Sequence, residues 1–324
     1  MDNNARHTLL KNFKKVKIFF PAFARAHSTV QSAIEMSLVT EEPNGAIICG
    51  RSGTGKSSLC ELLYEQYLST SIREDSKGAA QVTRAVFFEV PADVTVRQLV
   101  ERMLKKVGVS QCKGTTVQLT AMLLARLKTI QVEVVFLDEI QRLCVGLAER
   151  IRPLTLAWLV SFCNELKKPV ILAGTEECRD ISKGSEAFAN RYPYLSVLNF
   201  FQYEPRADSD YHRTLQKLDE ELHALMPAHS LVHLHDAEIA AGLYVATSGN
   251  LKWLWGVIFN ALNHCLCRSG SNGLVKGDFL YACDQLTLEF NLLSTGNPFA
   301  LDLVGAQHSI QTAQKKLQEL WVRE

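Results

Sequence analysis

The sequence predicts an α/β domain built on a parallel sheet, followed by an all-helical domain. Five short apolar runs alternate with amphipathic segments between residues 43 and 205, which is typical of a parallel sheet covered by helices on both faces. The first run leads into the pattern G-x-x-x-x-G-K-S, and a helical period follows it. After residue 205 only helical periodicity continues. We therefore expect a five-stranded parallel sheet with a helical lid after it.

The expected elements follow one another in this order. Strands are expected at 46–49, 85–90, 132–137, 170–173 and 195–201, and the polar stretch 69–81 is expected to be a loop. A short helix ending at Pro21 and a second helix over 27–39 precede the first strand, and lid helices are expected at 209–225, 236–246, 250–267 and 276–290. The resulting segments are a basic arm and helix (1–42), the α/β domain (43–205), the lid (206–290) and a tail (291–324).

Composition indicates an ordinary globular protein. The 324 residues carry a formal net charge of +1, so any basic surface has to be local. No uncharged run approaches the ~18–20 residues that cross a bilayer, and no membrane partner is expected. Nine cysteines without a C-x-x-C pair suit a reducing cytoplasm. The tail helix carries an apolar stripe of Leu317, Leu320 and Trp321, which either packs or docks a partner.

The glycine-rich pattern is a P-loop, or Walker A motif. Its glycines let successive backbone N–H groups point into one concavity at the positive end of the following helix, where phosphate oxygens bind. Lys56 is expected to reach the β- and γ-phosphates of ATP, and Ser57 to coordinate Mg²⁺. The nucleotide-binding segment comprises Gly50, Arg51, Ser52, Gly53, Thr54, Gly55, Lys56, Ser57 and Ser58.

Two adjacent carboxylates follow the third apolar run, as in a Walker B motif. A buried parallel strand delivers Asp138 to the carboxyl edge of the sheet, where it would hold Mg²⁺. Glu139 would polarise the water that attacks the γ-phosphate. Simple nucleotide kinases do not need this second acid, so the pair favours an ATP hydrolase. The sequence lacks an Asn-Lys-x-Asp motif, which argues against a guanine-specific GTPase.

Two further polar residues follow at positions that suit catalysis. Thr175 ends the fourth apolar run, where it could act as sensor 1 and position water, or simply cap the next helix. Arg191 stands just before the last strand, on the far side of the domain. There it could reach the nucleotide of a neighbouring subunit as an arginine finger, or pair with Glu186 on the surface.

Together these motifs resemble those of AAA+ ATPases, and within that superfamily the TniB/TnsC group of ATP-dependent transposition regulators. The resemblance rests on the L-A-G-T-E segment at 172–176, the N-R-aromatic context of Arg191 and the T-S-G-N-L turn at 247–251, with N-P-F at 297–299 adding weaker support. It covers roughly residues 20 to 290. Lys252 and Trp253 stand near the position of the sensor 2 arginine of many AAA+ proteins, and no residue is assigned that role.

The resemblance implies a mechanism and partners. ATP binding would drive assembly of a filament or ring on duplex DNA of any sequence, the assembly would recruit or activate a transposase, and hydrolysis would disassemble it. A TniQ-like targeting protein is an optional further partner. The positions that match DNA contacts of relatives are Arg97, Lys113, Thr115 and Thr116, which suit phosphates rather than base edges. Arg97 could equally belong to a solvated face.

Two other functions remain open from the sequence. The chain could be a helicase loader or initiator-type remodeller, or a non-catalytic switch whose ATP state controls assembly. A group formed by His229, His233 and His235 with Cys265 and Cys267 could be drawn as a metal site, but it lacks a recognised ligand spacing, and a structural role is expected for it.

Overall fold

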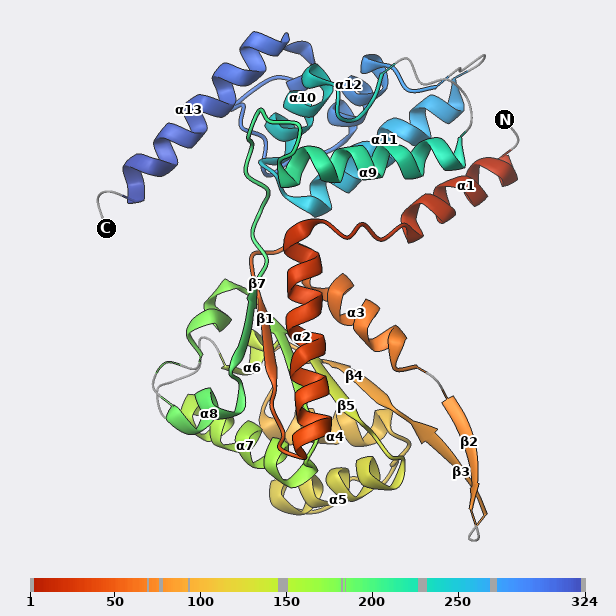
Figure 1. Cartoon of the computed structure of the whole chain (residues 1–324), viewed down its shortest axis with the longest axis vertical. Helices are drawn as coiled ribbons and strands as arrows, with labels where there is room; N and C mark the ends of the chain where they lie inside the picture. The colour runs from red at the N-terminus through yellow and green to blue at the C-terminus, as the bar shows by residue number, and fades with distance from the viewer. Residues whose placement is uncertain are drawn as a thin grey trace. The chain divides into compact units, whose positions relative to one another are not determined.

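The computed structural model describes residues 3–68, 70–75, 78–92, 94–144, 151–181, 183, 185–226, 232–268 and 273–321 (Figure 1). The contacts within it divide the chain into two compact units. Residues 23–199 form the first, which we call the α/β unit. Residues 1–22 together with 200–324 form the second, which we call the helical unit.

An all-parallel, five-stranded sheet forms the centre of the α/β unit. Its strands are β1 (Ala46–Cys49), β4 (Ala85–Glu89), β5 (Val134–Asp138), β6 (Val170–Gly174) and β7 (Tyr194–Val197), in the spatial order β4-β5-β6-β1-β7. These are the five strands that the sequence predicts, and the predicted fold class is confirmed. In this order β6 lies between β1, which enters the P-loop, and β5, which carries the paired acids.

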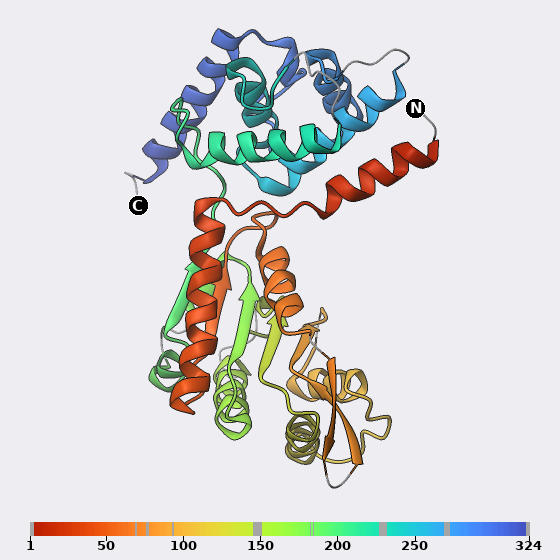
Figure 2. The same cartoon turned by 45° about the vertical axis from the view of Figure 1, so that its right-hand side comes forward.

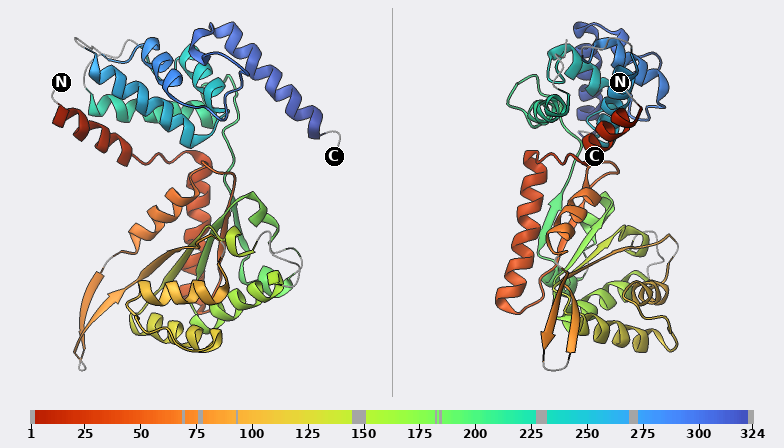
Figure 3. Two further views of the ribbon diagram at one scale, coloured as in Figure 1. Left: turned by 180° about the vertical axis from the view of Figure 1, so that it is seen from behind. Right: turned by 90° about the vertical axis from the view of Figure 1, so that its right-hand side faces the viewer.

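Helices cover both faces of this sheet (Figures 2 and 3). On one face lie α2 (Pro21–Thr40) and α3 (Lys56–Gln66), and on the other α4 (Val96–Lys106), α5 (Thr116–Thr129) and α7 (Ile151–Leu166). The ring of Phe136 on β5 packs on Tyr64 of α3, with ring centroids 6.3 Å apart. Its neighbours in sequence, Val135 and Leu137, join the core on the opposite face. Burial on both faces explains why the strands are uninterrupted apolar runs.

A separate antiparallel hairpin lies between α3 and β4. Its strands β2 (Thr70–Asp75) and β3 (Gly78–Thr83) pair from Thr70 with Thr83 to Asp75 with Gly78 (Figure 1). The expectation of a loop over 69–81 is therefore wrong. The strands pair only with each other. Residues 70–83 carry no apolar alternation of the kind that burial of one strand face imposes, and periodicity therefore does not predict these strands.

The helical unit is built from long helices around its own core. They are α1 (Asn3–Lys15), α9 (Asp210–Leu225), α10 (Ala237–Thr247), α11 (Leu251–Cys267), α12 (Lys276–Gln285) and α13 (Leu303–Trp321). Helix α11 packs on α12, and α10 packs on both α11 and α13. Tyr211 of α9 is completely buried, and its hydroxyl donates to the carbonyl oxygen of Ala240 at 2.9 Å. The four helices expected for the lid are thus present, but the last of them, α12, ends at Gln285 rather than at residue 290.

The T-S-G-N-L turn joins α10 to α11 in a tight left-handed connection. Ser248 and Gly249 have φ angles of 48° and 75°, and the side chain of Asn250 accepts from the amide of Trp253 at 3.2 Å to cap α11. A Cβ atom on Gly249 would lie 2.2 Å from the carbonyl oxygen of Phe201. Both the backbone angle and this close approach therefore require glycine.

The ends of the chain pack within the helical unit. Helix α1 ends at Lys15 rather than at Pro21, and Pro21 instead begins α2, because proline fits the first turn of a helix. The ring of Phe13 lies 4.9 Å from that of Trp255, and residues 1–22 group with the helical unit.

The tail helix α13 packs on α10. The side chains of its predicted stripe, Leu317, Leu320 and Trp321, lie outside the part of the chain that the structure describes. None of the described helices is long and apolar enough to cross a membrane.

Candidate nucleotide-binding site

The P-loop has the backbone of a phosphate cradle. Gly53 and Gly55 adopt left-handed φ angles of 83° and 97°, which other residues rarely adopt. At Gly50 the backbone approaches the end of β7 so closely that a Cβ atom would lie 2.0 Å from the carbonyl oxygen of Leu198. The buried Thr54 hydroxyl donates to the carbonyl oxygen of Arg51 at 2.9 Å and closes the loop.

Lys56 occupies the mouth of this loop. Only 8% of the residue is exposed, and its Nζ donates to the carbonyl oxygen of Arg51 at 2.8 Å. Burial lowers the pKa of Lys56, while the charges of Asp138 and Glu139 act in the opposite direction. The P-loop cation therefore lies within electrostatic reach of both predicted acids, on the first turn of α3, where a phosphate would bind.

The residues expected to hold Mg²⁺ have the donor atoms that this ion prefers. Asp138 ends β5 and is 5% exposed, and its Oδ1 accepts from the amide of Glu139 at 2.8 Å. Its Oδ2 makes no hydrogen bond with any residue that the structure describes. Ser57, at the start of α3, is exposed. A carboxylate oxygen and a serine hydroxyl beside a phosphate site fit the oxygen coordination of Mg²⁺.

Glu139 has a strained backbone. Its φ angle of 60° lies in the left-handed region, which is uncommon for a residue with a side chain. The carboxylate accepts from Nε2 of Gln141 at 2.7 Å and pairs with Arg142 at 3.1 Å. The predicted catalytic base is therefore held by two side chains of helix α6 (Gln141–Cys144). Arg142 also contacts the carboxylate of Glu89 at 3.0 Å.

Gln141 is a site residue that sequence reasoning missed. While its Nε2 donates to Glu139, its Oε1 accepts from the backbone amide of Thr175 at 3.1 Å. A Cβ atom on Gly174 would lie 2.8 Å from the same Oε1, so the glycine leaves room for this contact. In the sequence, Gln141 stands out only by its place two residues after the acidic pair. The pairing of β5 with β6 is what brings Gln141 to Thr175.

Thr175 lies where the sequence places it, at the end of β6, between the P-loop strand and the strand of the acids. It stands at the N-cap of a short 3-10 helix, η1 (Glu176–Asp180), but its hydroxyl makes no capping bond to the backbone. The hydroxyl instead donates to the carboxylate of Glu177, and this bond lowers the pKa of Glu177.

Arg191 lies beside the amino ends of the parallel strands, whereas the P-loop and Asp138 lie at their carboxyl ends. It ends helix α8 (Glu186–Arg191), and its carbonyl oxygen accepts from the amide of Gly45 at 2.6 Å, just before β1 begins. The P-loop follows the other end of the same strand. No ion pair joins Arg191 to Glu186 in the part of the chain that the structure describes. Strand β1 separates Gly45 from the P-loop by four residues, which is about 13 Å at a rise of 3.3 Å per residue.

The four predicted DNA-contacting residues come together at the starts of α4 and α5. Arg97 donates to the carbonyl oxygen of Gly114 at 2.7 Å and pairs with Glu101 at 3.0 Å, so it joins the two segments. The hydroxyl of Thr115 caps α5, Thr116 opens that helix, and Lys113 is exposed.

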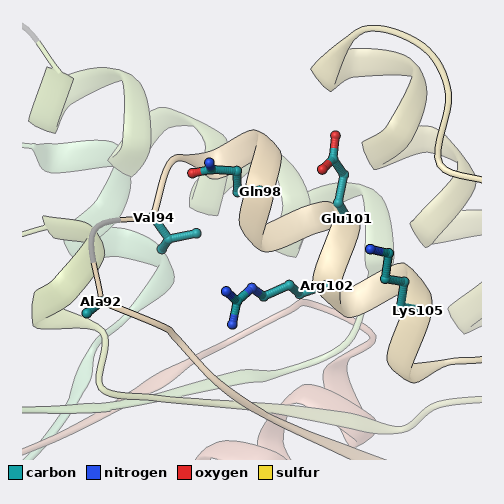
Figure 4. A pocket seen from close by; sticks show the side chains of 6 residues that line it. All are labelled: Ala92, Val94, Gln98, Glu101, Arg102 and Lys105. Atoms are coloured by element: carbon teal, nitrogen blue, oxygen red, sulfur yellow. The ribbon is translucent and has the colours of Figure 1, made fainter.

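Further cations lie along α4. A pocket of 170 Å³ is lined by Ala92, Val94, Gln98, Glu101, Arg102 and Lys105. Figure 4 shows Arg102 extending from the helix toward the segment that carries Ala92 and Val94. Arg102 and Lys105 are both exposed, and no sequence motif includes them. Exposed cations on an amphipathic helix are ordinary, and what marks these two is that they share helix α4 with Arg97.

The sheet, the P-loop and the acidic pair, with a helical unit after them, define an AAA+ type of P-loop protein. The chain belongs to the TniB family, because the family model described as bacterial TniB protein matches residues 14–201. No functionally curated protein matches the chain.

Solved structures share the fold at low sequence identity. Cdc6p from Pyrobaculum aerophilum matches with a TM-score of 0.60 at 12% identity, covering 88% of this chain and 71% of that one. The ORC2 protein of Aeropyrum pernix, in ADPNP–ADP complexes, gives 0.59 at 13%, with coverages of 85% and 71%. The ORC1 protein of the same organism, in complex with DNA, gives 0.57 at 13%, with coverages of 83% and 66%. The chain thus spans just under two thirds of the length of ORC1.

Proposed function

We propose that the chain is an ATP-dependent, DNA-binding regulator of transposition. Membership of the TniB family supports this function. The observation that carries it is that Lys56 and Arg191 lie at opposite ends of the parallel strands. A subunit arranged in this way binds nucleotide at the carboxyl ends of its strands and presents a cation at their amino ends, so that ATP links neighbouring subunits.

Each residue of the site has a part in ATP hydrolysis. Lys56 would leave the carbonyl of Arg51 and bind the β- and γ-phosphates. Ser57 and Asp138 would hold Mg²⁺, which when bound would neutralise phosphate charge. Glu139 polarises the attacking water, and Gln141 keeps its carboxylate beside Thr175 at the end of β6.

Arg191 acts in trans in this proposal. An arginine that stabilises the charge of the transition state accelerates phosphoryl transfer by about 10³–10⁵-fold in the best-studied cases. From its place before β7, Arg191 serves the nucleotide of the next subunit and makes hydrolysis depend on assembly.

The starts of α4 and α5 form the proposed DNA-contacting surface. Lys113, Thr115 and Thr116 offer a cation and hydroxyl groups to phosphates, and Arg97 positions the loop that carries them. Such contacts read no bases, which suits binding to duplex DNA of any sequence. The ORC1 protein of Aeropyrum pernix, which shares this fold, has been solved in complex with DNA, and this supports a DNA-binding surface on the fold.

The assembly, a filament or ring, would recruit or activate a transposase, with a TniQ-like targeting protein as a further partner, in the cytoplasm. The likeness of the fold to ORC and Cdc6 proteins keeps one alternative, an initiator-type remodeller. A transposase that stimulates ATP hydrolysis in the presence of DNA would separate the two.

Electron microscopy of the full chain with duplex DNA tests the proposal, with and without a non-hydrolysable ATP analogue. We expect nucleotide-dependent filaments or rings on DNA of any sequence. Lys56→Ala should abolish them, whereas Lys128→Ala, which removes an exposed cation at the end of α5, should not. Particles that bind nucleotide but ignore DNA would refute the DNA-binding part.

A mixing experiment tests the role of Arg191. Arg191→Ala should hydrolyse ATP about a thousandfold more slowly than the wild type, and Glu139→Gln should also lose hydrolysis while still binding ATP and assembling. Mixed on DNA, the two should recover part of the activity, because each Glu139→Gln subunit supplies an intact Arg191 to a neighbour whose Glu139 is intact. Absence of recovery, with both variants folded and co-assembled, would rule out action in trans. Glu139→Gln should keep the assembly from dissociating in ATP.

A further inference from the structure

A cluster of histidines around one buried carboxylate lies in the helical unit, in a separate unit from the P-loop. Asp219 and His223 are one turn apart on α9, and His233 and His235 come shortly before α10. The Nδ1 atoms of the three imidazoles lie 2.7 Å (His233), 3.4 Å (His223) and 3.8 Å (His235) from Oδ2 of Asp219. One oxygen atom thus faces three ring nitrogens.

The carboxylate of Asp219 is held in place from its other side. Its Oδ1 accepts from the amide of Leu234 at 2.9 Å, and only 6% of the side chain is exposed. This bond turns Oδ2 toward the histidines and leaves it as the shared atom of the cluster.

His223 has a ring nitrogen without a partner. Its Nδ1 lies 2.7 Å from the carbonyl oxygen of Asp219, so Nδ1 carries the ring proton and donates this hydrogen bond to the carbonyl. Its Nε2 is buried and has no hydrogen-bond partner among the described residues. A buried lone pair is costly unless a donor or a metal ion occupies it.

We propose that Asp219, His223, His233 and His235 bind a divalent transition-metal ion, with zinc as the favoured ion. Imidazole nitrogens and a carboxylate oxygen are its usual ligands besides thiolate. In a tetrahedral zinc site with bonds of about 2.0–2.1 Å, neighbouring ligand atoms lie about 3.3 Å apart. One ligand atom each of Asp219, His223 and His233 already lie within 4.8 Å of one another.

The two cysteines that the sequence groups with these histidines have other partners. Cys265 is buried and contacts the guanidinium of Arg268 at 3.8 Å, and Cys267 contacts Arg6 at 2.6 Å. His229 lies outside the described residues. Sequence spacing missed the site because two of its ligands, Asp219 and His223, come from the preceding helix.

Four protein ligands would leave no open position, so the ion would be structural rather than catalytic. It would tie the second half of α9 to the segment that leads into α10. The site would thereby hold these two segments of the helical unit together without touching the ATP chemistry.

Calorimetric titration of the untagged full chain with zinc chloride, in buffer containing Mg²⁺, tests the site. We expect one zinc ion per chain, a higher melting temperature with zinc, and visible absorption of tetrahedral cobalt when Co²⁺ replaces it. His233→Ala and His223→Ala should each weaken zinc binding at least tenfold, whereas His308→Ala, on the exposed side of α13, should bind like the wild type.

Circular dichroism without zinc shows whether each variant is folded. If His233→Ala does not fold, the half-exposed His235→Ala takes its place. The proposal is overturned if the wild type does not bind zinc at micromolar free concentration, or if the cluster variants and His308→Ala bind it equally. ATP hydrolysis is measured in parallel and should not change on zinc removal.

Discussion

The backbone amide of Thr175 donates a hydrogen bond to the side chain of Gln141 at 3.1 Å, which ties the end of β6 to the helix after β5. Gln141 also binds the carboxylate of Glu139, so one amide side chain connects the proposed sensor and the proposed base. The orientation of Glu139 therefore depends on the end of a neighbouring strand.

Gln141→Ala should slow ATP hydrolysis with little change in ATP affinity. A hydrogen bond to a charged group contributes about 1.5–3 kcal/mol, which corresponds to roughly a ten- to hundredfold loss in kcat if the bond orients Glu139 in the transition state. Single-turnover hydrolysis and binding of a fluorescent ATP analogue separate the two effects. Gln285→Ala, at the exposed end of α12, is the control. A variant with weaker ATP binding and unchanged turnover would contradict the assigned role.

Gly50→Ala should destabilise the α/β unit. Its new methyl group would lie 2.0 Å from the carbonyl oxygen of Leu198, a backbone atom that cannot rotate away, and overpacking of this kind costs about 1–3 kcal/mol. Gly256→Ala on α11 is the matched control, because nothing lies within 4 Å of its new methyl group and alanine favours the helix by about 1 kcal/mol. Denaturant unfolding of both variants measures the contrast. Equal stabilities would mean that the loop relaxes freely.

Arg102→Ala combined with Lys105→Ala should weaken DNA binding most at low salt. If both cations contact phosphates, the negative slope of log K against log salt becomes shallower by about 0.9 for each contact removed. Fluorescence anisotropy of a labelled duplex over a salt series gives the slope. Lys128→Ala removes an exposed cation from the other end of α5 and should leave it unchanged. An unaltered slope in the double variant would exclude α4 beyond its first turn from the DNA surface.

The buried thiols should resist alkylation at pH 8. Burial raises the pKa of Cys163 to about 11 and that of Cys283 to about 12. Because the thiolate is the reactive form, roughly one Cys163 side chain in a thousand is reactive at that pH, and reactivity grows as the pH rises toward 11. Cys267 is exposed and should be labelled first. Mass spectrometry of peptides after brief iodoacetamide treatment checks the order, and early labelling of Cys283 would show that the helical unit opens readily.

Sequence patterns predicted the sheet because burial on both faces leaves a direct mark, such as the apolar run that ends at Asp138. The hairpin from Thr70 to Thr83 left no such mark, since its strands pair only with each other. Motif spacing likewise located Lys56 and Asp138. It could not locate Gln141 or the partnership of Asp219 with His233, because these contacts depend on how separate elements meet.

The hydrogen bond from Gly45 to Arg191 has a geometric consequence for any assembly of the proposed kind. One end of β1 carries the loop that receives the subunit's own nucleotide, and the other end fixes the backbone of the arginine offered to the next one. The distance between successive ATP molecules would then be set by β1, a short and fully buried strand inside the sheet. Pitch or ring size would be a property of the rigid interior, and changes in surface loops would leave it unaltered.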